Sequence, residues 1–252
     1  MKGRKMRNLK VCIAYNGAAY HGFQRQNNAV TVQQTIEEKM SKLLGQPVTI
    51  NGCSRTDTGV HARQFYFNAK IDNAIPCEGF VKGMNSLLPD DIAVLSCEDT
   101  DEDFHARFCS KGKEYIYIVS NAPQRDVFSR NLVLHYPAAL DEKKMDKAAK
   151  LFIGEHDFAA FCKAEAKEHL KSTVRTVYDF SVTRDGDKVI FTVSGNGFLH
   201  NMVRIMVGTL IYVNESKRTE NDIIRSLETG DRETAGKTIP PEGLYLNKVF
   251  YS

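Results

Sequence analysis

The residues best suited to chemistry lie in one short polar segment, Cys53 to Arg63. It reads Cys-Ser-Arg-Thr-Asp-Thr-Gly-Val-His-Ala-Arg, with apolar runs at 47–50 before it and 65–69 after it. Asp57 is its only acid and is flanked by two arginines and a histidine. A carboxylate held by guanidinium groups stays ionised, because the opposite charge favours the charged form. The segment indicates a loop that presents Asp57 as an ionised nucleophile; the alternative is an aspartate that caps a turn.

Two other enzyme classes are suggested by short motifs and disfavoured by their details. Asp57-Thr58-Gly59 matches the tripeptide of aspartic proteases, but that chemistry needs two carboxylates that share one proton, and the chain has one such copy. Ser194-Gly195-Asn196-Gly197 could open a dinucleotide-binding helix of an oxidoreductase. The third glycine of that fingerprint is replaced here by His200.

Basic and aromatic residues alternate in two further segments, which favours contact with nucleic acid. Phe104 to Phe108 leads into the run Lys111 to Tyr117, and Tyr20 to Gln26 carries a similar mixture of rings, amides and cations. Aromatic rings stack on bases, and neighbouring cations meet phosphates. An ordinary aromatic strand has the same pattern, so these segments support the interpretation without deciding it.

One expected helix, 198–213, is apolar apart from Asn201 and Arg204. A buried arginine requires an anionic partner. Asp57 is the candidate with the most to gain from that pairing. The alternative is an Arg204 that faces solvent.

Composition places the chain among globular proteins without a membrane span. It has 252 residues, 42% hydrophobic and 26% charged, and no stretch approaches the ~18 apolar residues of a transmembrane helix. The net charge of +3 is too small to mark a dedicated nucleic-acid domain, so the distribution of the cations matters more than their sum. Six cysteines without a Cys-x-x-Cys pair indicate reduced thiols and a cytoplasmic protein.

The order of the expected elements indicates an α+β fold with two ferredoxin-like halves. Strands at 9–15, 47–50, 64–70 and 92–97 alternate with a helix capped by Thr31 and a helix at 76–87, which is the order βαββαβ. The second half repeats it, with strands at 114–119, 174–183, 188–194 and 244–251 and helices at 141–152, 198–213 and 220–227. We expect the halves, 1–109 and 110–252, to join antiparallel or mixed sheets around a central cleft.

Five segments together resemble the tRNA pseudouridine synthase A family, and they span nearly the whole chain. The segments are Tyr20–Gln26, Ser54–Ala62, Phe104–Tyr117, Gly195–Arg204 and Pro240–Leu246. Ser54, Thr58 and Phe23 stand where glycine, alanine and tryptophan are more usual. Of these departures only Thr58, beside the proposed nucleophile, could alter its hydrogen bonding.

The resemblance implies the pseudouridine synthase fold and an enzyme that isomerises uridine in the anticodon stem-loop of tRNA, at positions 38, 39 or 40. It also implies a homodimer, with one tRNA touching both subunits, and neither a metal nor an organic cofactor. Asp57 aligns with the essential aspartate and Tyr115 with the tyrosine that stacks on the base. Arg204 aligns with the arginine that pairs with the aspartate. The first half then carries the Asp57 loop, and the second carries Tyr115 and the Arg204 helix.

In the implied reaction the N1–C1′ bond breaks, the uracil rotates and a C5–C1′ bond forms, after the nucleotide is flipped out. Asp57 could attack C1′, attack C6 or start removal of a 2′ proton, and the sequence leaves these routes open. Tyr115, directly or through water, is expected to take the proton from C5. No hydrolytic water needs activation, so no metal is required.

Further residues are expected to contact the substrate. Leu244 could form a wall of the uracil pocket, and Arg55 could contact RNA or order the loop. The complete set expected to bind substrate is Arg25, Arg55, His61, Arg63, Arg107, Tyr115 and Leu244, and Lys111 and the basic N-terminus could add phosphate contacts. The competing hypothesis is a non-catalytic RNA-binding module, which would leave the arginine-flanked Asp57 unexplained.

Overall fold

The computed structural model describes residues 6–163 and 171–251. The chain folds into two compact units, the first formed by Met1–Lys111 with Leu246–Ser252 and the second by Gly112–Tyr245. The sequence-based division at 109/110 assigned the whole last strand to the second half. No helix in the described part of the chain is both long and apolar enough to cross a membrane.

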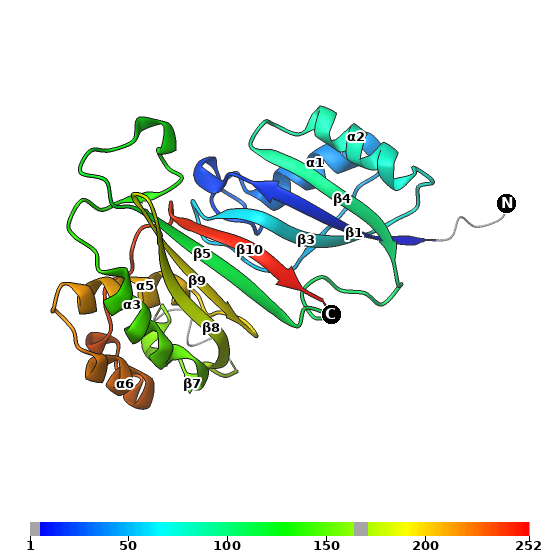
Figure 1. Cartoon of the computed structure of the whole chain (residues 1–252). Helices are drawn as coiled ribbons and strands as arrows, with labels where there is room; N and C mark the ends of the chain where they lie inside the picture. The colour runs from blue at the N-terminus through cyan, green and yellow to red at the C-terminus, as the bar shows by residue number, and fades with distance from the viewer. Residues whose placement is uncertain (1–5, 164–170, 252) are drawn as a thin grey trace. The chain divides into compact units, whose positions relative to one another are not determined.

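The first unit contains the expected βαββαβ order (Figure 1). Its elements are β1 (Arg7–Tyr15), α1 (Val32–Leu44), β2 (Asn51–Gly52), β3 (His61–Ile71), α2 (Cys77–Leu87), β4 (Ile92–Thr100) and the returning β10 (Leu244–Phe250), with a 3-10 turn η1 at Gly17–Ala19. The strands lie in the order β4-β1-β3-β10, with β2 paired to β3. The pairs β1/β3, β1/β4 and β2/β3 are antiparallel, as a split-βαβ sheet requires.

Helix α1 begins and ends at the residues that the sequence predicts. The Thr31 hydroxyl accepts a hydrogen bond from the Gln34 N–H, and Gly45 follows the helix in the left-handed conformation. The Gln34 side chain donates to Glu38 instead of reaching back to Thr31, so the expected reciprocal capping box is only half formed. Both α1 and α2 lie over the same face of the sheet in Figure 1.

The strand expected at 47–50 is wrong, because side chains of α1 take up its backbone donors. The Val48 N–H donates to the Ser41 hydroxyl at 3.1 Å, and the Ile50 N–H donates to the Glu37 carboxylate at 3.1 Å. These two donors are used within the α1 contact, so pairing with β3 begins only at Asn51. Segment 47–50 is therefore an irregular connection, held against α1, that leads into the sheet.

The second unit is a mixed α+β fold. Its strands are β5 (Gly112–Ser120), β6 (Leu134–His135), β7 (Gly154–Asp157), β8 (Val174–Asp185) and β9 (Lys188–Gly195), and its helices are α3 (Glu142–Ala149), α5 (Met202–Asn214) and α6 (Glu220–Thr229). Its described residues, 112–163 and 171–245, also form the 3-10 turns η2 (Val127–Ser129), η3 (Lys150–Phe152), η4 (Ala159–Phe161) and η5 (Arg232–Thr234). The strands lie in the order β5-β9-β8-β7 with antiparallel pairs, while β6 runs parallel to β5.

Helix α5 begins at Met202, four residues later than the apolar run predicts. Asn201, directly before it, has a φ of 65° in the left-handed region, which a right-handed helix cannot contain. Met202 closes the preceding turn by donating its N–H to the Leu199 carbonyl at 3.0 Å. Gly195 and Gly197 therefore do not open a helix, which removes the remaining basis for a dinucleotide-binding loop.

The core of the second unit is rich in aromatic rings. Phe152 lies edge-on to Phe161 with ring centres 5.1 Å apart, and it also contacts Phe180 at 5.8 Å. All three side chains are fully buried. Burial of each ring contributes about 1.5–3 kcal/mol to the unit's stability.

Candidate active site

Asp57 lies in a tight turn between β2 and β3, as the sequence predicts. The Val60 N–H donates to the Asp57 carbonyl at 3.1 Å, and Gly59 has a φ of 77° within the turn. Asp57 is half-buried and Arg55 is exposed. The turn therefore presents a carboxylate from a residue whose backbone carbonyl is already hydrogen-bonded.

The segment 16–23 clamps this turn against the first unit. Gly22 has a φ of +81°, and a Cβ added to it would lie 2.5 Å from the Thr56 carbonyl oxygen. The same oxygen accepts a hydrogen bond from the Phe23 N–H at 3.2 Å, and the Gly59 N–H donates to the Tyr20 carbonyl at 3.2 Å. The backbone on both sides of Asp57 is thus held by main-chain contacts that only a glycine at position 22 permits.

His61 lies directly after the turn and is part of the clamp. Its side chain is 1% exposed, and its Nδ1 accepts a hydrogen bond from the Gly17 N–H at 3.0 Å. An Nδ1 that accepts cannot carry the ring proton, so in this geometry the neutral ring carries it on Nε2. This position supports a positioning role for His61, although the sequence suggested contact with substrate.

Thr56 is anchored by its side chain as well as by its carbonyl. Its hydroxyl shares a buried hydrogen bond of 2.8 Å with the Tyr15 hydroxyl at the end of β1. Tyr15 packs against Phe65 on β3, with ring centres 5.7 Å apart. The residue before Asp57 is therefore fixed directly to the central strands.

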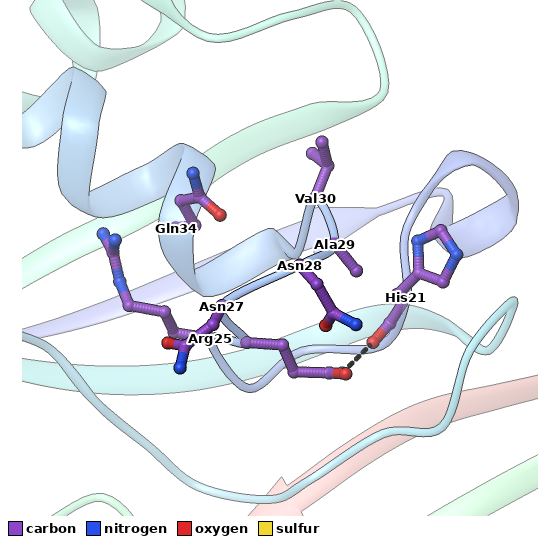
Figure 2. Close-up of a pocket in the computed structure, with 8 residues that line it drawn as sticks. His21, Arg25, Asn27, Asn28, Ala29, Val30 and Gln34 are labelled. Carbon is purple, nitrogen blue, oxygen red and sulfur yellow. Dashed lines mark hydrogen bonds between the residues drawn. The ribbon is translucent and has the colours of Figure 1, made fainter.

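A polar pocket of about 610 Å³ opens beside the clamp, between 21 and 34. Its lining is rich in amides and is drawn in Figure 2: His21, Arg25, Gln26, Asn27, Asn28, Ala29, Val30 and Gln34. The Gln26 side chain donates to the His21 carbonyl at 2.8 Å, which closes the loop on itself. Arg25 and Gln34 lie toward one end of the pocket and His21 toward the other (Figure 2).

Arg25 enters this pocket with its charge already compensated. Its Nε donates to the Glu37 carboxylate at 2.9 Å, and its Nη2 lies 2.8 Å from the same oxygen. The Glu37 side chain is only 6% exposed and also accepts from Gln33 and the Ile50 N–H. Glu37 therefore orients Arg25 and weakens it as a phosphate contact.

The other cations expected to contact RNA in the first unit are exposed. Arg63 lies on β3, and Arg107 lies in the turn after β4, with its guanidinium carbon 5.9 Å from the centre of the exposed Phe108 ring. Buried asparagines hold that turn, since Asn8 donates to the Phe104 carbonyl at 2.9 Å and Asn68 accepts from the Ala106 N–H at 3.0 Å. These hydrogen bonds hold the turn that carries the basic Arg107 and the aromatic Phe108.

Both tyrosines on β5 are buried, Tyr115 at 6% exposure and Tyr117 at 0%. Tyr117 is fully buried and donates to the Pro240 carbonyl at 2.7 Å, and burial raises the pKa of Tyr117 well above its ordinary value. Tyr115 lies edge-on to Phe198, with ring centres 5.2 Å apart and planes at 81°. The Tyr117 hydroxyl is thus committed to the Pro240 carbonyl, whereas the Tyr115 ring packs against Phe198.

Arg204 is held in the first turn of α5 and is not a freely moving surface residue. Its Nε donates to the Ile239 carbonyl at 2.7 Å, and its Nη1 donates to the Asn201 side chain at 2.8 Å. The left-handed Asn201 that delays the helix is thus also the residue that orients the guanidinium. Leu244 is buried at the start of β10, after a turn closed by its N–H on the Pro241 carbonyl at 2.9 Å.

Sequence reasoning assigned no positioning role to the residues that hold these groups. The positioning residues Gly17, Gly22 and Asn201 carry no reactive group, so a search for chemistry passes over them. The sequence feature that could have pointed to them is a residue type that tolerates unusual backbone: Gly17 and Gly22 precede α1, and Asn201 precedes α5. Among residues 6–163 and 171–251, no cluster of three or more His, Cys, Asp or Glu could hold a metal ion.

Comparison with known proteins defines the class of protein as a pseudouridine synthase. The family model for tRNA pseudouridine synthase matches residues 11–109 and 148–252. The tRNA pseudouridine synthase A of Ruminiclostridium cellulolyticum is 45% identical over 247 residues, and that of Clostridium acetobutylicum is 44% identical over 246. Each alignment covers 98% of this chain and 100% of the relative. The chain belongs to the tRNA pseudouridine synthase family.

Solved structures add little to this assignment. A Cbf5-Nop10-Gar1 complex aligns at 13% identity with a TM-score of 0.39, over 81% of this chain and 44% of that chain. This likeness is too weak to bear on the fold or the activity.

Proposed function

We propose that the chain converts uridine to pseudouridine in the anticodon stem-loop of tRNA, at one or more of positions 38, 39 and 40, with Asp57 as the nucleophile. The observation that carries the proposal is the clamped turn: one carboxylate is presented between two strands on backbone fixed by Gly22 and Thr56. Membership of the family supplies the reaction class. A nucleophile held in a fixed position suits this reaction, in which the bound uracil must rotate relative to C1′.

Arg204 is proposed to keep Asp57 ionised and to stabilise charge that develops during the reaction. Support comes from its locked guanidinium, because a cation that is already oriented needs no reorganisation as the reaction proceeds. The proposal requires the Asp57 carboxylate and the Arg204 guanidinium to act together. A double-mutant cycle on turnover tests that requirement, since independent residues give additive losses.

Tyr115 is proposed to stack on the flipped uracil and, directly or through water, to take the proton from C5. In this isomerisation the N1–C1′ bond breaks and the C5–C1′ bond forms, the proton leaves C5 and N1 gains one, so no redox partner is needed. Three first steps are consistent with this balance of bonds and protons: Asp57 attack on C1′, Asp57 attack on C6, and removal of a 2′ proton. Leu244 is proposed as a wall of the uracil pocket.

Exposed cations are proposed to bind the phosphates around the target and to offset the cost of flipping it, roughly a few kcal/mol. Arg55, Arg63 and Arg107 are exposed candidates, and so is Arg25. Arg25 is a weaker candidate because Glu37 compensates its charge, and His61 is expected to act through the loop. Affinity for tRNA should fall as salt rises, because bound phosphates release counterions.

The proposal also includes a homodimer in the cytoplasm, with one tRNA touching both subunits and with neither a metal nor an organic cofactor. Light scattering of the purified protein, alone and with tRNA, measures the stoichiometry. Activity after treatment with a chelator and dialysis tests the cofactor statement, and a loss of turnover would contradict it.

Release of tritium from tRNA labelled at C5 of uridine tests the activity directly. Wild-type protein should release tritium in proportion to the pseudouridine formed, and mapping of the product should locate it at positions 38 to 40. The competing hypothesis, a non-catalytic RNA-binding module, predicts tRNA binding with no tritium release.

A further inference from the structure

A second pocket, distant in sequence from the Asp57 loop, gathers three cations in the second unit. Its volume is about 320 Å³, at the lower end of the ~300–1,000 Å³ of small-ligand pockets. We call it the basic pocket; it is lined by Tyr212, Arg218, Arg232, Glu233, Ala235, Gly236 and Lys237. These residues come from the end of α5, the approach to α6, and η5 with the segment after it, in the orange part of Figure 1.

Two glycines build the basic pocket by bringing the segment after η5 onto α5. A Cβ at Gly208 would lie within 2.0 Å of the Lys237 carbonyl oxygen, and one at Gly236 within 2.5 Å of the Thr209 backbone. The Gly236 N–H also donates to the Thr209 hydroxyl at 2.8 Å. This close approach sets the Lys237 ammonium 5.9 Å from the centre of the Tyr212 ring.

Arg232 is the most informative residue of the basic pocket. It is half-buried, and burial lowers the pKa of its guanidinium. Among the residues that the structure describes, none accepts a hydrogen bond or forms an ion pair within 4 Å with this side chain; Glu233 attracts it from farther away. Removing an arginine from water without such a partner is costly, and an anionic ligand would offset that cost.

The charges around Arg232 leave the basic pocket positive. Arg218 donates to the Glu233 carbonyl at 2.5 Å, which uses no carboxylate. Glu233 is the single acid in the lining, against the three cations. Outside the lining, Glu215 attracts Lys237 and is also paired with Lys217 at 2.8 Å, and Asp222 attracts Arg218, so Arg232 keeps the least compensated charge of the three.

We propose that the basic pocket binds a phosphate group and that its source is the backbone of the RNA substrate; this source rests on the proposed function. The planar Arg232 fork suits two phosphate oxygens, and Lys237 adds a point charge. Tyr212 lies eight residues after Arg204 on α5, about 12 Å along the helix axis. The bound phosphate therefore belongs to a nucleotide some way from the flipped uridine.

The test compares charge-removing variants inside and outside the basic pocket. Arg232→Gln and Lys237→Gln should each raise the Kd for tRNA about five- to thirty-fold and reduce the slope of log K against log salt by about one. Arg225→Gln removes an exposed charge from α6 outside the lining and should change neither quantity. The single-turnover rate at saturating tRNA should stay within a few-fold of wild type for the pocket variants.

A second arm uses inorganic phosphate to distinguish the two sources. Protection of wild-type protein by millimolar phosphate in thermal melts, lost in Arg232→Gln while tRNA affinity is unchanged, would overturn the RNA source in favour of a free phosphate compound. No effect of any pocket variant in either assay would overturn the site itself.

Two control variants separate the loss of charge from a loss of folding. Arg232→Lys keeps the charge and should restore most of the salt slope, which separates charge from folding, and Lys237→Gln carries the test if Arg232→Gln fails to fold. Wild-type protein that binds tRNA through the basic pocket yet releases no tritium would contradict the proposed function and leave the phosphate site standing.

Discussion

The α-carbon of Gly22 faces the carbonyl oxygen of Thr56 so closely that a methyl group on it would come within 2.5 Å of that oxygen. Thr56 is the residue before Asp57, and its carbonyl also accepts the Phe23 N–H. The position of the proposed nucleophile therefore depends on the absence of a side chain at position 22.

Gly22→Ala should push the Asp57 turn away and lower turnover about ten-fold or more, since small misplacements of reacting groups are costly. Gly45→Ala is the matched control. Gly45 also has a positive φ, of +67°, but nothing lies within 4 Å of its added Cβ. Both variants should lose about 1–2 kcal/mol of stability from the left-handed backbone. Equal turnover in the two variants would show that the clamp does not position Asp57.

Asp57→Ala should abolish tritium release while tRNA binding persists, because the nucleophile is lost and the exposed cations remain. Asp72→Ala removes another acid from the same unit, at an exposed position after β3, and should leave the rate unchanged. Normal product from Asp57→Ala would end the proposal.

Arg204→Ala should lower the single-turnover rate about 10²–10³-fold, the range for loss of one oriented electrostatic group, and weaken binding much less. Arg204→Lys keeps a cation but loses the fork that bonds both Ile239 and Asn201, so it should recover only part of the rate. Unchanged turnover in Arg204→Ala would reduce this arginine to a structural residue.

Tyr115→Phe should keep stacking and slow proton removal from C5, by about 10²-fold if the hydroxyl is the base. Tyr117→Phe on the same strand removes the buried hydrogen bond to the Pro240 carbonyl, so it should cost about 1 kcal/mol of stability and leave the chemical step unchanged. A wild-type rate for Tyr115→Phe would reassign the base.

The Tyr136–Glu215 pair predicts a pH-dependent stability. Ion pairing with Lys217 and a hydrogen bond from the Tyr136 hydroxyl lower the pKa of Glu215. A carboxylate whose folded pKa is lowered stabilises the fold above its unfolded value of about 4.3, and that contribution is lost as pH falls through the lower folded value. Tyr136→Phe should therefore lower the Tm at pH 7 and have a smaller effect near pH 3; an equal shift at both would contradict this account.

Local patterns were sufficient for the secondary structure wherever one segment decides its own conformation. Helix α1 spans Val32–Leu44 between its caps Thr31 and Gly45, as those residues predict, because the capping hydrogen bonds are formed within a few residues. The errors at 47–50 and at the start of α5 have a different origin. Side chains of α1 take the backbone donors of 47–50, and a left-handed Asn201 delays α5.

The sequence by itself determined which groups are candidates for the chemistry, because reactivity depends on residue type: a single arginine-flanked carboxylate at Asp57, a tyrosine on a basic strand and a lone arginine in an apolar helix. Only the tertiary structure decided how these groups are held and where charge remains. Gly22 meets Thr56 and Glu37 meets Arg25 across 34 and 12 residues of chain, and Arg232 enters a pocket with Lys237 through a glycine contact on α5. Such contacts depend on the packing of whole elements, which no local pattern of residues contains.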